Sequence, residues 1–338
     1  MKKSEDVLKL ERAVRKLKAE RSNARKLVRQ YEKELDLTTQ IVDVVHNAVE
    51  AAPSVVVPKI KIYGESAHDE VAVLLLSDVH IGKRTLSYNP KVFVKRLGIL
   101  RDAMMSIVTA QRSIRPIRKL VILWGGDIVD AEAVYPSQAV DHISIPIIDQ
   151  LFAVGVPELT GFLLFCLEQF EEVECYCVRG NHGRQNAAKW SSSKSTNWDF
   201  VLYRALEAAT REQERLKWNI NTKDWKTMFR IMGKGFLLTH GDMIRRYYNL
   251  PWYGMTRQAM RWQNAYQTKM KLRYFCFGHF HSASFLRFNN CVIIVNGSFV
   301  SDDSFAEEYI GVASVPEQQL FGMHPKHGIS WRYTLSLK

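Results

Sequence analysis

Five short polar motifs, each placed directly after an apolar stretch, constrain the fold of this chain more than any other feature. The stretches with their motifs are VAVLLLSDVHIG, KLVILWGGD, VECYCVRGNH, GFLLTHGD and RYFCFGHFH. Short apolar runs bounded by turn residues predict buried β-strands, so each motif is expected at the end of a strand. Gly, Asn and Asp also favour turns, and this alternative explains a single motif. Five motifs in order indicate one shared site.

The side chains in these motifs are of the types that bind metal ions. Carboxylates, amide oxygens and imidazoles are ligands of divalent first-row metals. Alternate residues on a strand or its extension point the same way, so Asp78 and His80 can reach one ion together. His279 and His281 have the same spacing and can instead contact two ions. The sequence therefore predicts a metal site at the strand ends.

The motifs resemble, in order and spelling, those of the calcineurin-like metallophosphoesterases: DxH, GDxxD, GNH, a lone His and GHxH. The resemblance covers residues 71 to 298, and stand-alone phage and bacterial phosphoesterases look most similar. It implies an α/β fold, a four-layer αββα sandwich of two mixed sheets flanked by helices, which a long N-terminal helix precedes in this chain. It also implies a two-metal enzyme that hydrolyses phosphoesters.

The resemblance also assigns roles to individual residues. Seven are expected to bind two ions, with Asp127 bridging them: Asp78, His80, Asp127 and His281 for one ion, and Asp127, Asn181, His240 and His279 for the other. His182 would lie beside the scissile phosphate and protonate the leaving oxygen, or alternatively would only orient a metal ligand. Manganese is the expected metal, with Fe, Zn, Ni and Mg as alternatives.

Departures from common family patterns leave the substrate open. GNH is followed by Gly183 and Arg184, where an acidic residue is common. Ala131 stands where serine/threonine phosphatases have Arg, and Asp130 stands where double-strand-break repair nucleases usually have His. The resemblance therefore supports the catalytic core more strongly than either of these two substrate classes.

Basic and aromatic residues near the motifs favour a phosphodiester in nucleic acid or a nucleotide. Arg184 lies in a polar loop after GNH, and Arg245 and Arg246 begin a segment in which arginines alternate with Tyr and Trp. Cations can hold phosphates while rings stack on bases, so these three arginines are the expected substrate contacts. A surface loop and a helix with core aromatics are the structural alternatives. A phosphomonoesterase and a non-catalytic nucleic-acid-binding scaffold are the functional ones.

Charge and composition favour an anionic partner and an intracellular location. The formal net charge is +12, and residues 1–30 hold eleven Lys or Arg against four acids. This stretch is interpreted as a basic arm for phosphate backbones or as a solvated helix face. No apolar run approaches the ~20 residues of a membrane span, no secretory signal is evident, and the five cysteines include no CxxC pair. A cytoplasmic protein of a bacterium or phage-infected cell, without membrane contact, is expected.

Three segments are predicted: a basic helix or coiled coil at 1–51, a linker at 52–69 and a phosphoesterase domain at 70–338. A heptad repeat from Leu10 to Val49 places apolar residues at ten of its twelve core positions. The alternative is one helix packed on its own catalytic domain. Prolines end the helix, and an edge strand is possible at 59–63. Helices are also predicted at 140–170, broken by two prolines, and at 197–211.

We predict that residues 4–51 associate between chains, because the heptad seam would bury apolar side chains between two or more helices. Light scattering of the full-length chain at tens of micromolar should give an oligomer. A variant with Glu at Val28 and Leu35 is the control and should be monomeric. A monomeric wild-type chain would favour packing within one molecule instead.

Overall fold

The computed structural model describes residues 69–132, 134, 142–185, 197–245, 251–302 and 315–338, together with 18, 20, 21, 23 and 25. The chain divides into two compact units, residues 1–53 and 54–338. The described residues of the first unit are helical and exposed. Most of the predicted coiled coil, the linker and the possible edge strand at 59–63 lie outside the described residues.

A six-stranded sheet forms the first half of the second unit, in the order β11-β10-β1-β2-β3-β4. Its strands are β1 (Glu70–Leu76), β2 (Ile117–Trp124), β3 (Glu172–Cys177), β4 (Leu216–Ile220), β10 (Glu317–His324) and β11 (Gly328–Ser336). Strands β1 to β4 pair in parallel, and β10 pairs antiparallel with β1 and β11. The carboxyl ends of β1, β2 and β3 therefore lie at one edge of the sheet.

A five-stranded sheet, ordered β5-β6-β7-β9-β8, forms the second half. Its strands are β5 (Lys226–Ile231), β6 (Lys234–Thr239), β7 (Leu272–Phe277), β8 (Ser284–Phe288) and β9 (Cys291–Val295). Strands β6, β7 and β9 are parallel. The five strands predicted from the motifs are confirmed as β1, β2, β3, β6 and β7.

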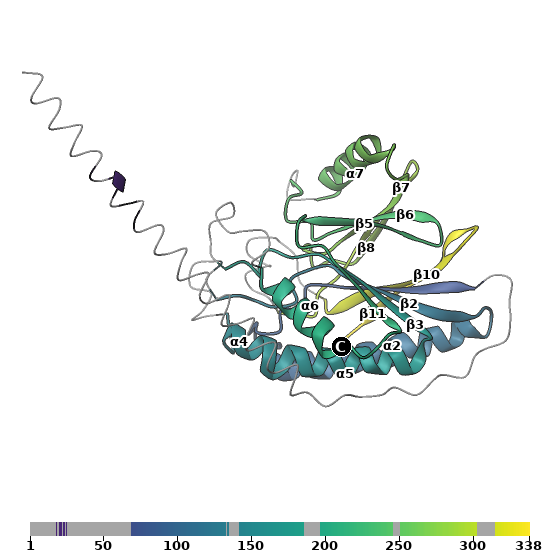
Figure 1. The fold of residues 1–338 in the computed structure, drawn as a ribbon. Helices are drawn as coiled ribbons and strands as arrows, with labels where there is room; N and C mark the ends of the chain where they lie inside the picture. The colour runs from purple at the N-terminus through teal and green to yellow at the C-terminus, as the bar shows by residue number, and fades with distance from the viewer. Residues whose placement is uncertain are drawn as a thin grey trace, which may run out of the picture. The chain divides into compact units, whose positions relative to one another are not determined.

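Helices cover the outer faces of both sheets and complete the predicted αββα arrangement (Figure 1). The first sheet carries α2 (Pro90–Arg112), α5 (Val156–Gln169) and α6 (Trp198–Ala209), and the second carries α7 (Trp252–Tyr266). A short α4 (Ile147–Asp149) and a π-helical segment η1 (Gln150–Gly155) precede α5. The helix predicted at 197–211 is confirmed as α6, which Asn197 caps by accepting a hydrogen bond from the backbone N–H of Asp199.

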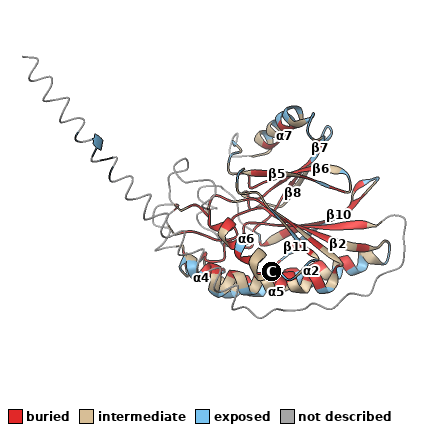
Figure 2. Cartoon of the chain, in the orientation of Figure 1, coloured by how far each residue is buried: buried red, intermediate tan, exposed pale blue. Residues whose placement is uncertain are grey.

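The main core lies between the two sheets, where alternate side chains of facing strands meet. Figure 2 shows that these strands are largely buried. Along β6, Phe236 and Leu238 join this core, whereas Leu237 faces the other way. That second face packs against α7, where Trp262 stacks on Phe275 at a ring-centroid distance of 6.1 Å. The two-residue period of the strands thus supplies both layers of contact.

The helix predicted at 140–170 differs from the observed one in a physical detail. Residues 142–146 were predicted to be helical and are not. The helical run begins after Pro146 and continues through Pro157 instead of breaking there. Pro157 stands in the first turn of α5, directly after η1. Proline clashes with the carbonyl four residues earlier in a regular helix, and the wider π turn accommodates it.

The run Ile147–Gln169 is long and apolar enough to cross a membrane, by length and composition alone. Asp149, Gln150 and Glu158 interrupt the segment, so it is not a continuous apolar run in the sequence. Leu159, Leu163 and Leu167 on this run are fully buried in the protein. Packing of the helix on the first sheet and on α6 accounts for its apolar composition.

Candidate metal centre

The five motifs meet beyond the carboxyl ends of β1, β2, β3, β6 and β7. Five of their residues have backbone φ angles in the left-handed region: Asp78 (54°), His80 (50°), Asp127 (53°), His279 (70°) and His281 (52°). Such a conformation in a non-glycine residue costs about 1–3 kcal/mol and persists only where the surroundings enforce it. The strand ends are therefore bent sharply, and the bends carry polar side chains.

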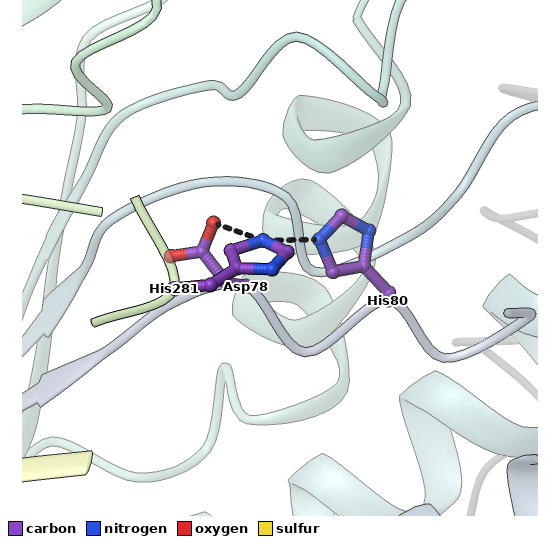
Figure 3. A group of neighbouring side chains, drawn as sticks. All are labelled: Asp78, His80 and His281. Atoms are coloured by element: carbon purple, nitrogen blue, oxygen red, sulfur yellow. Dashed lines mark hydrogen bonds and ion pairs between the residues drawn. The ribbon is translucent and has the colours of Figure 1, made fainter. Parts of the chain in front are cut away.

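The first group of donors comprises Asp78, His80 and His281, all buried (Figure 3). His281 Nε2 lies 3.4 Å from Asp78 Oδ1 and 3.3 Å from His80 Nε2. At most one proton can lie between two imidazole nitrogens, so the other nitrogen presents a lone pair. Asp78 also accepts a hydrogen bond from the backbone N–H of His279, at 2.9 Å. This packing of lone pairs suits a cation.

The second group comprises Asp127, His240 and His279, with Asn181 beside them. His240 Nε2 lies 2.9 Å from both Asp127 Oδ2 and Asn181 Oδ1. Its Nδ1–H donates to the carbonyl oxygen of Gly125, at 2.8 Å. That bond leaves Nε2 as the nitrogen directed at the carboxylate and the amide, which is the tautomer a metal ligand requires.

His182 lies at the edge of the site, and Asp130 fixes its orientation. His182 Nδ1 is 2.7 Å from Asp130 Oδ1, and its backbone N–H donates to Asp127 Oδ1 at 2.7 Å. The second oxygen of Asp130 is 3.4 Å from His80 Nδ1. Asp130 therefore orients two imidazoles. The sequence analysis did not assign it this role, although it is the last residue of the GDxxD motif.

Gln150 holds Asp130 in turn. Its side chain accepts a hydrogen bond from the Asp130 backbone N–H at 2.9 Å and donates to the Asp130 carbonyl at 2.8 Å. Gln150 is the first residue of η1, so the irregular helix presents its amide to the motif after β2. No signal in the sequence identified Gln150, because its partner is twenty residues away on a loop.

The electrostatics of the site favour positive charge at its centre. Burial opposes charge on both Asp127 and His240, but their mutual attraction outweighs it. The pKa of Asp127 is lowered well below its ordinary value, and that of His240 is raised to about 10. Burial and the neighbouring His240 lower the pKa of His279 well below its ordinary value. The carboxylates therefore favour a proton on His240, whereas burial and the charge of His240 keep His279 neutral.

Asp199 is a further buried carboxylate that the sequence analysis missed. It accepts hydrogen bonds from the backbone N–H groups of Asp127 (3.0 Å), Ile128 (2.9 Å), Val129 (3.3 Å) and Gly180 (2.8 Å). These donors belong to the loops after β2 and β3. Burial and the charge of Asp127 raise the pKa of Asp199 to about 6. Its position in the first turn of α6 gave no functional signal, because acidic residues are common there.

Close backbone approach between the same two loops requires glycine. Gly126 has φ 86°, and a Cβ there would lie 2.4 Å from the backbone N of Gly180. A Cβ on Gly180 would lie 2.0 Å from Asp127 Oδ1. The glycines of GGD and GNH therefore let Asp127 and Asn181 lie side by side.

The predicted substrate contacts have different placements. Arg184 is buried, and its Nε–H donates to the carbonyl of Asn181 at 2.8 Å, so it supports the GNH loop. Arg245 is exposed on the segment after His240, and Arg246 lies outside the described residues. The charge of Asp242 is among the causes that raise the pKa of His240, whose Nδ1–H donates to the carbonyl oxygen of Gly125.

Residues 71–297 match the calcineurin-like phosphoesterase family. No curated protein sequence matches the chain. Among solved structures, Vps29 of Entamoeba histolytica complexed with zinc is 11% identical, covers 79% of this chain and 99% of its own, and has a TM-score of 0.34.

Two further structures show comparable likeness. A novel archaeal phosphodiesterase is 12% identical over 78% of this chain and 99% of its own, with a TM-score of 0.36. A hypothetical protein of Pyrococcus horikoshii is 10% identical over 79% of this chain and 87% of its own, with a TM-score of 0.39.

We predict that Asp199→Ala lowers the free energy of unfolding by about 3 kcal/mol or more, since each buried donor left without a partner costs about 1–3 kcal/mol. Urea denaturation measures this. Glu207→Ala removes a carboxylate from the same helix, where it pairs with Arg204 on the surface, and should cost under about 1 kcal/mol. Equal losses in the two variants would show that Asp199 does not hold the loops.

Proposed function

The chain belongs to the calcineurin-like phosphoesterase family and is a metal-dependent phosphoester hydrolase, and from this we propose that it cleaves phosphodiesters in nucleic acid or nucleotides. The family match carries the hydrolase assignment, and the donor groups gathered at the strand ends, one of which contains Asp127, agree with it. The exposed basic segment after His240 supports a phosphodiester substrate with more than one phosphate. A phosphomonoester is the alternative substrate that the assays below separate.

The donor set fits two divalent ions. In our proposal, Asp78, His80, Asp127 and His281 hold one, and Asp127, Asn181, His240 and His279 hold the other. Nitrogen and oxygen donors of this kind accept manganese as well as iron, zinc or nickel, and manganese is the metal we propose. When bound, the ions supply charge that stabilises phosphate oxygens and lower the pKa of a water molecule.

The residues of the chain have separate tasks in this scheme. Asp130 holds Nδ1 of His182, so Nε2 is the nitrogen that donates a proton to the leaving oxygen. The 4.6 Å distance between the His182 and His80 rings places that proton beside the donor group that would hold an ion. Gln150 and Asp199 keep the supporting loops in place. Arg245 and Arg246 are proposed to contact phosphates outside the reacting centre, and Arg184 to steady the GNH loop that carries Asn181.

A panel of substrates tests the proposal. Protein reconstituted with Mn²⁺ is assayed on DNA, RNA, cyclic nucleotides, a bis-aryl phosphodiester and an aryl phosphomonoester. We expect hydrolysis of the diesters to exceed that of the monoester in kcat/KM. A strong preference for the monoester would make the chain a phosphatase. Nucleic-acid binding without turnover of any substrate would instead support a scaffold.

We predict that Asp127→Asn lowers bound Mn²⁺ by at least half, because the Asp127 carboxylate contacts residues of the second donor group and the His182 backbone beside the first. Elemental analysis of the reconstituted protein measures the ion content. Asp102→Asn removes an exposed carboxylate from α2 and should leave the content unchanged. Retention of all metal in Asp127→Asn would refute the bridging role.

We predict that His182→Ala retains its metal and loses about 10²–10⁴-fold in kcat, the usual size of a general acid's contribution. Substrates with very good leaving groups should lose less, because their leaving oxygens need less protonation. His327→Ala, at an exposed turn, is the control and should behave as wild type. Loss of metal from His182→Ala would assign His182 a structural role.

A further inference from the structure

A polar cleft lies at the end of the second sheet remote from the metal centre. Its volume is about 620 Å³, within the usual range of ligand sites. Four cationic residues line it, namely Arg230, Lys234, Lys271 and Arg273. Four carboxamide side chains line it as well, from Gln263, Asn264, Gln267 and Asn290, and no acidic residue does.

The cleft is built from structured elements. Gln263 donates to the carbonyl of Leu272 at 2.9 Å and joins α7 to the start of β7. The register between β6 and β7 shifts there, so that Gly235 faces Leu272 and Phe236 faces Tyr274. Arg273 is therefore an extra residue on β7 at this irregularity of the strand pairing. No salt bridge joins the four cations of the cleft to any residue that the structure describes.

A strip of exposed residues on α7 leads from the segment after His240 towards this cleft. Met255, Ala259 and Trp262 pack on the sheet. The opposite side carries Tyr253, Arg257, Arg261 and Asn264, all exposed, at spacings of three or four residues. Residues three and four apart lie on one helix face, so the four form a continuous strip. Asn264, at its end, lines the cleft.

The beginning of α7 is fixed against the segment that follows His240. A Cβ on Gly254 would lie 2.1 Å from the carbonyl oxygen of Arg245, so the two backbones touch. The fifteen residues of α7 span roughly 22 Å at the rise of an α-helix. The strip therefore begins beside Gly254, which approaches the backbone of Arg245 five residues beyond His240, and it ends at the cleft.

The segment that contains α7 and β7 carries only positively charged Lys and Arg side chains and no acidic ones. Residues 243–301 contain eight Lys or Arg and no Asp or Glu. In a chain with 35 acidic residues, this segment alone contributes +8 to the net charge of +12. Phosphate-binding surfaces combine such a field with hydrogen-bond donors and exposed rings. Tyr253, 62% exposed, and Phe288, 42% exposed, supply rings near the two ends.

We infer that the exposed side of α7 and the cleft at its end bind the sugar-phosphate backbone of a nucleic acid strand. The inference rests on the proposed phosphodiesterase function, because the strand bound by α7 is assumed to be the substrate that reaches the metal centre. About six phosphates of a duplex strand cover a track of this length at 3.4 Å per phosphate. Cations contact phosphates along the track, and the carboxamides of the cleft donate hydrogen bonds to phosphate and sugar oxygens.

The test compares two full-length proteins that have lost the same charge. One carries Arg257→Gln, Arg261→Gln and Lys271→Gln. The other carries Lys91→Gln, Lys95→Gln and Lys326→Gln, which are exposed residues on α2 and the β10–β11 turn. Fluorescence anisotropy measures the affinity of the Mn²⁺-reconstituted proteins for a labelled phosphorothioate oligonucleotide of about 20 nucleotides, longer than the track.

We expect the α7 variant to bind the oligonucleotide at least tenfold more weakly than wild type at about 0.1 M salt. The slope of log binding constant against log salt concentration should be smaller in magnitude by about two to three. The control should stay within about threefold of wild type. Turnover of the bis-aryl phosphodiester, which is too short to reach the track, should be unchanged in both variants. If the wild type did not turn over the bis-aryl phosphodiester, the proposed function would be refuted. The comparison of oligonucleotide affinities tests the track separately.

Two outcomes would overturn the inference. Equal weakening in the α7 and control variants would show a general effect of net charge, and no weakening in the α7 variant would show that this face does not bind. Inorganic phosphate serves as a competitor. If it binds the wild type but not the α7 variant while oligonucleotide affinity is equal, the cleft takes a small anion. The single change Lys271→Glu, at an exposed position, repeats the comparison should the triple variant unfold.

Discussion

The buried carboxylate of Asp199 is the interaction on which the rest of the centre depends. It accepts four backbone hydrogen bonds from the loops after β2 and β3 and so fixes the relative positions of Asp127 and Asn181. These two loops lie on neighbouring parallel strands, but parallel pairing alone ends at Cys177 and leaves the loops unpaired. One side chain from α6 satisfies backbone donors that burial would otherwise leave without partners.

Backbone strain and the repulsion of buried charges both oppose the geometry of the centre. Five motif residues adopt left-handed backbone angles, and carboxylates and imidazoles crowd together in a buried space. Both features are unfavourable in isolation. Helices, glycines and the amide of Gln150 constrain the backbone, and the proton held by His240 balances part of the negative charge. Divalent ions held by these residues would balance it more fully, because each would supply two positive charges. The family's use of divalent metals agrees with this electrostatic requirement.

Helix α7 combines a packed inner side with an exposed row of cations. Its inner side completes the core of the second sheet through Trp262, which stacks between Trp225 and the aromatic rings of β7. Its outer side is basic, and the segment around it has no acid. The arginines and the aromatic residues that alternate in this sequence therefore have different structural roles. The buried rings fix the helix in place, and the exposed cations are presented in a row by that fixed helix.

The sequence by itself determined the five motif strands and the helix α6, because local periodicity and the turn residues at strand ends require no distant partner. The resemblance of its motifs to a known family implied the fold class. It also determined which ligand types would gather, since parallel strands bring their carboxyl ends to one edge of a sheet. Only the tertiary structure decided the left-handed bends, the roles of Asp130, Gln150 and Asp199, and the passage of the helix through Pro157. Each depends on a contact between residues far apart in the chain or on how a neighbouring element packs. An acidic residue in the first turn of a helix has the same local signal whether it faces water or holds two loops together, and packing alone separates the two.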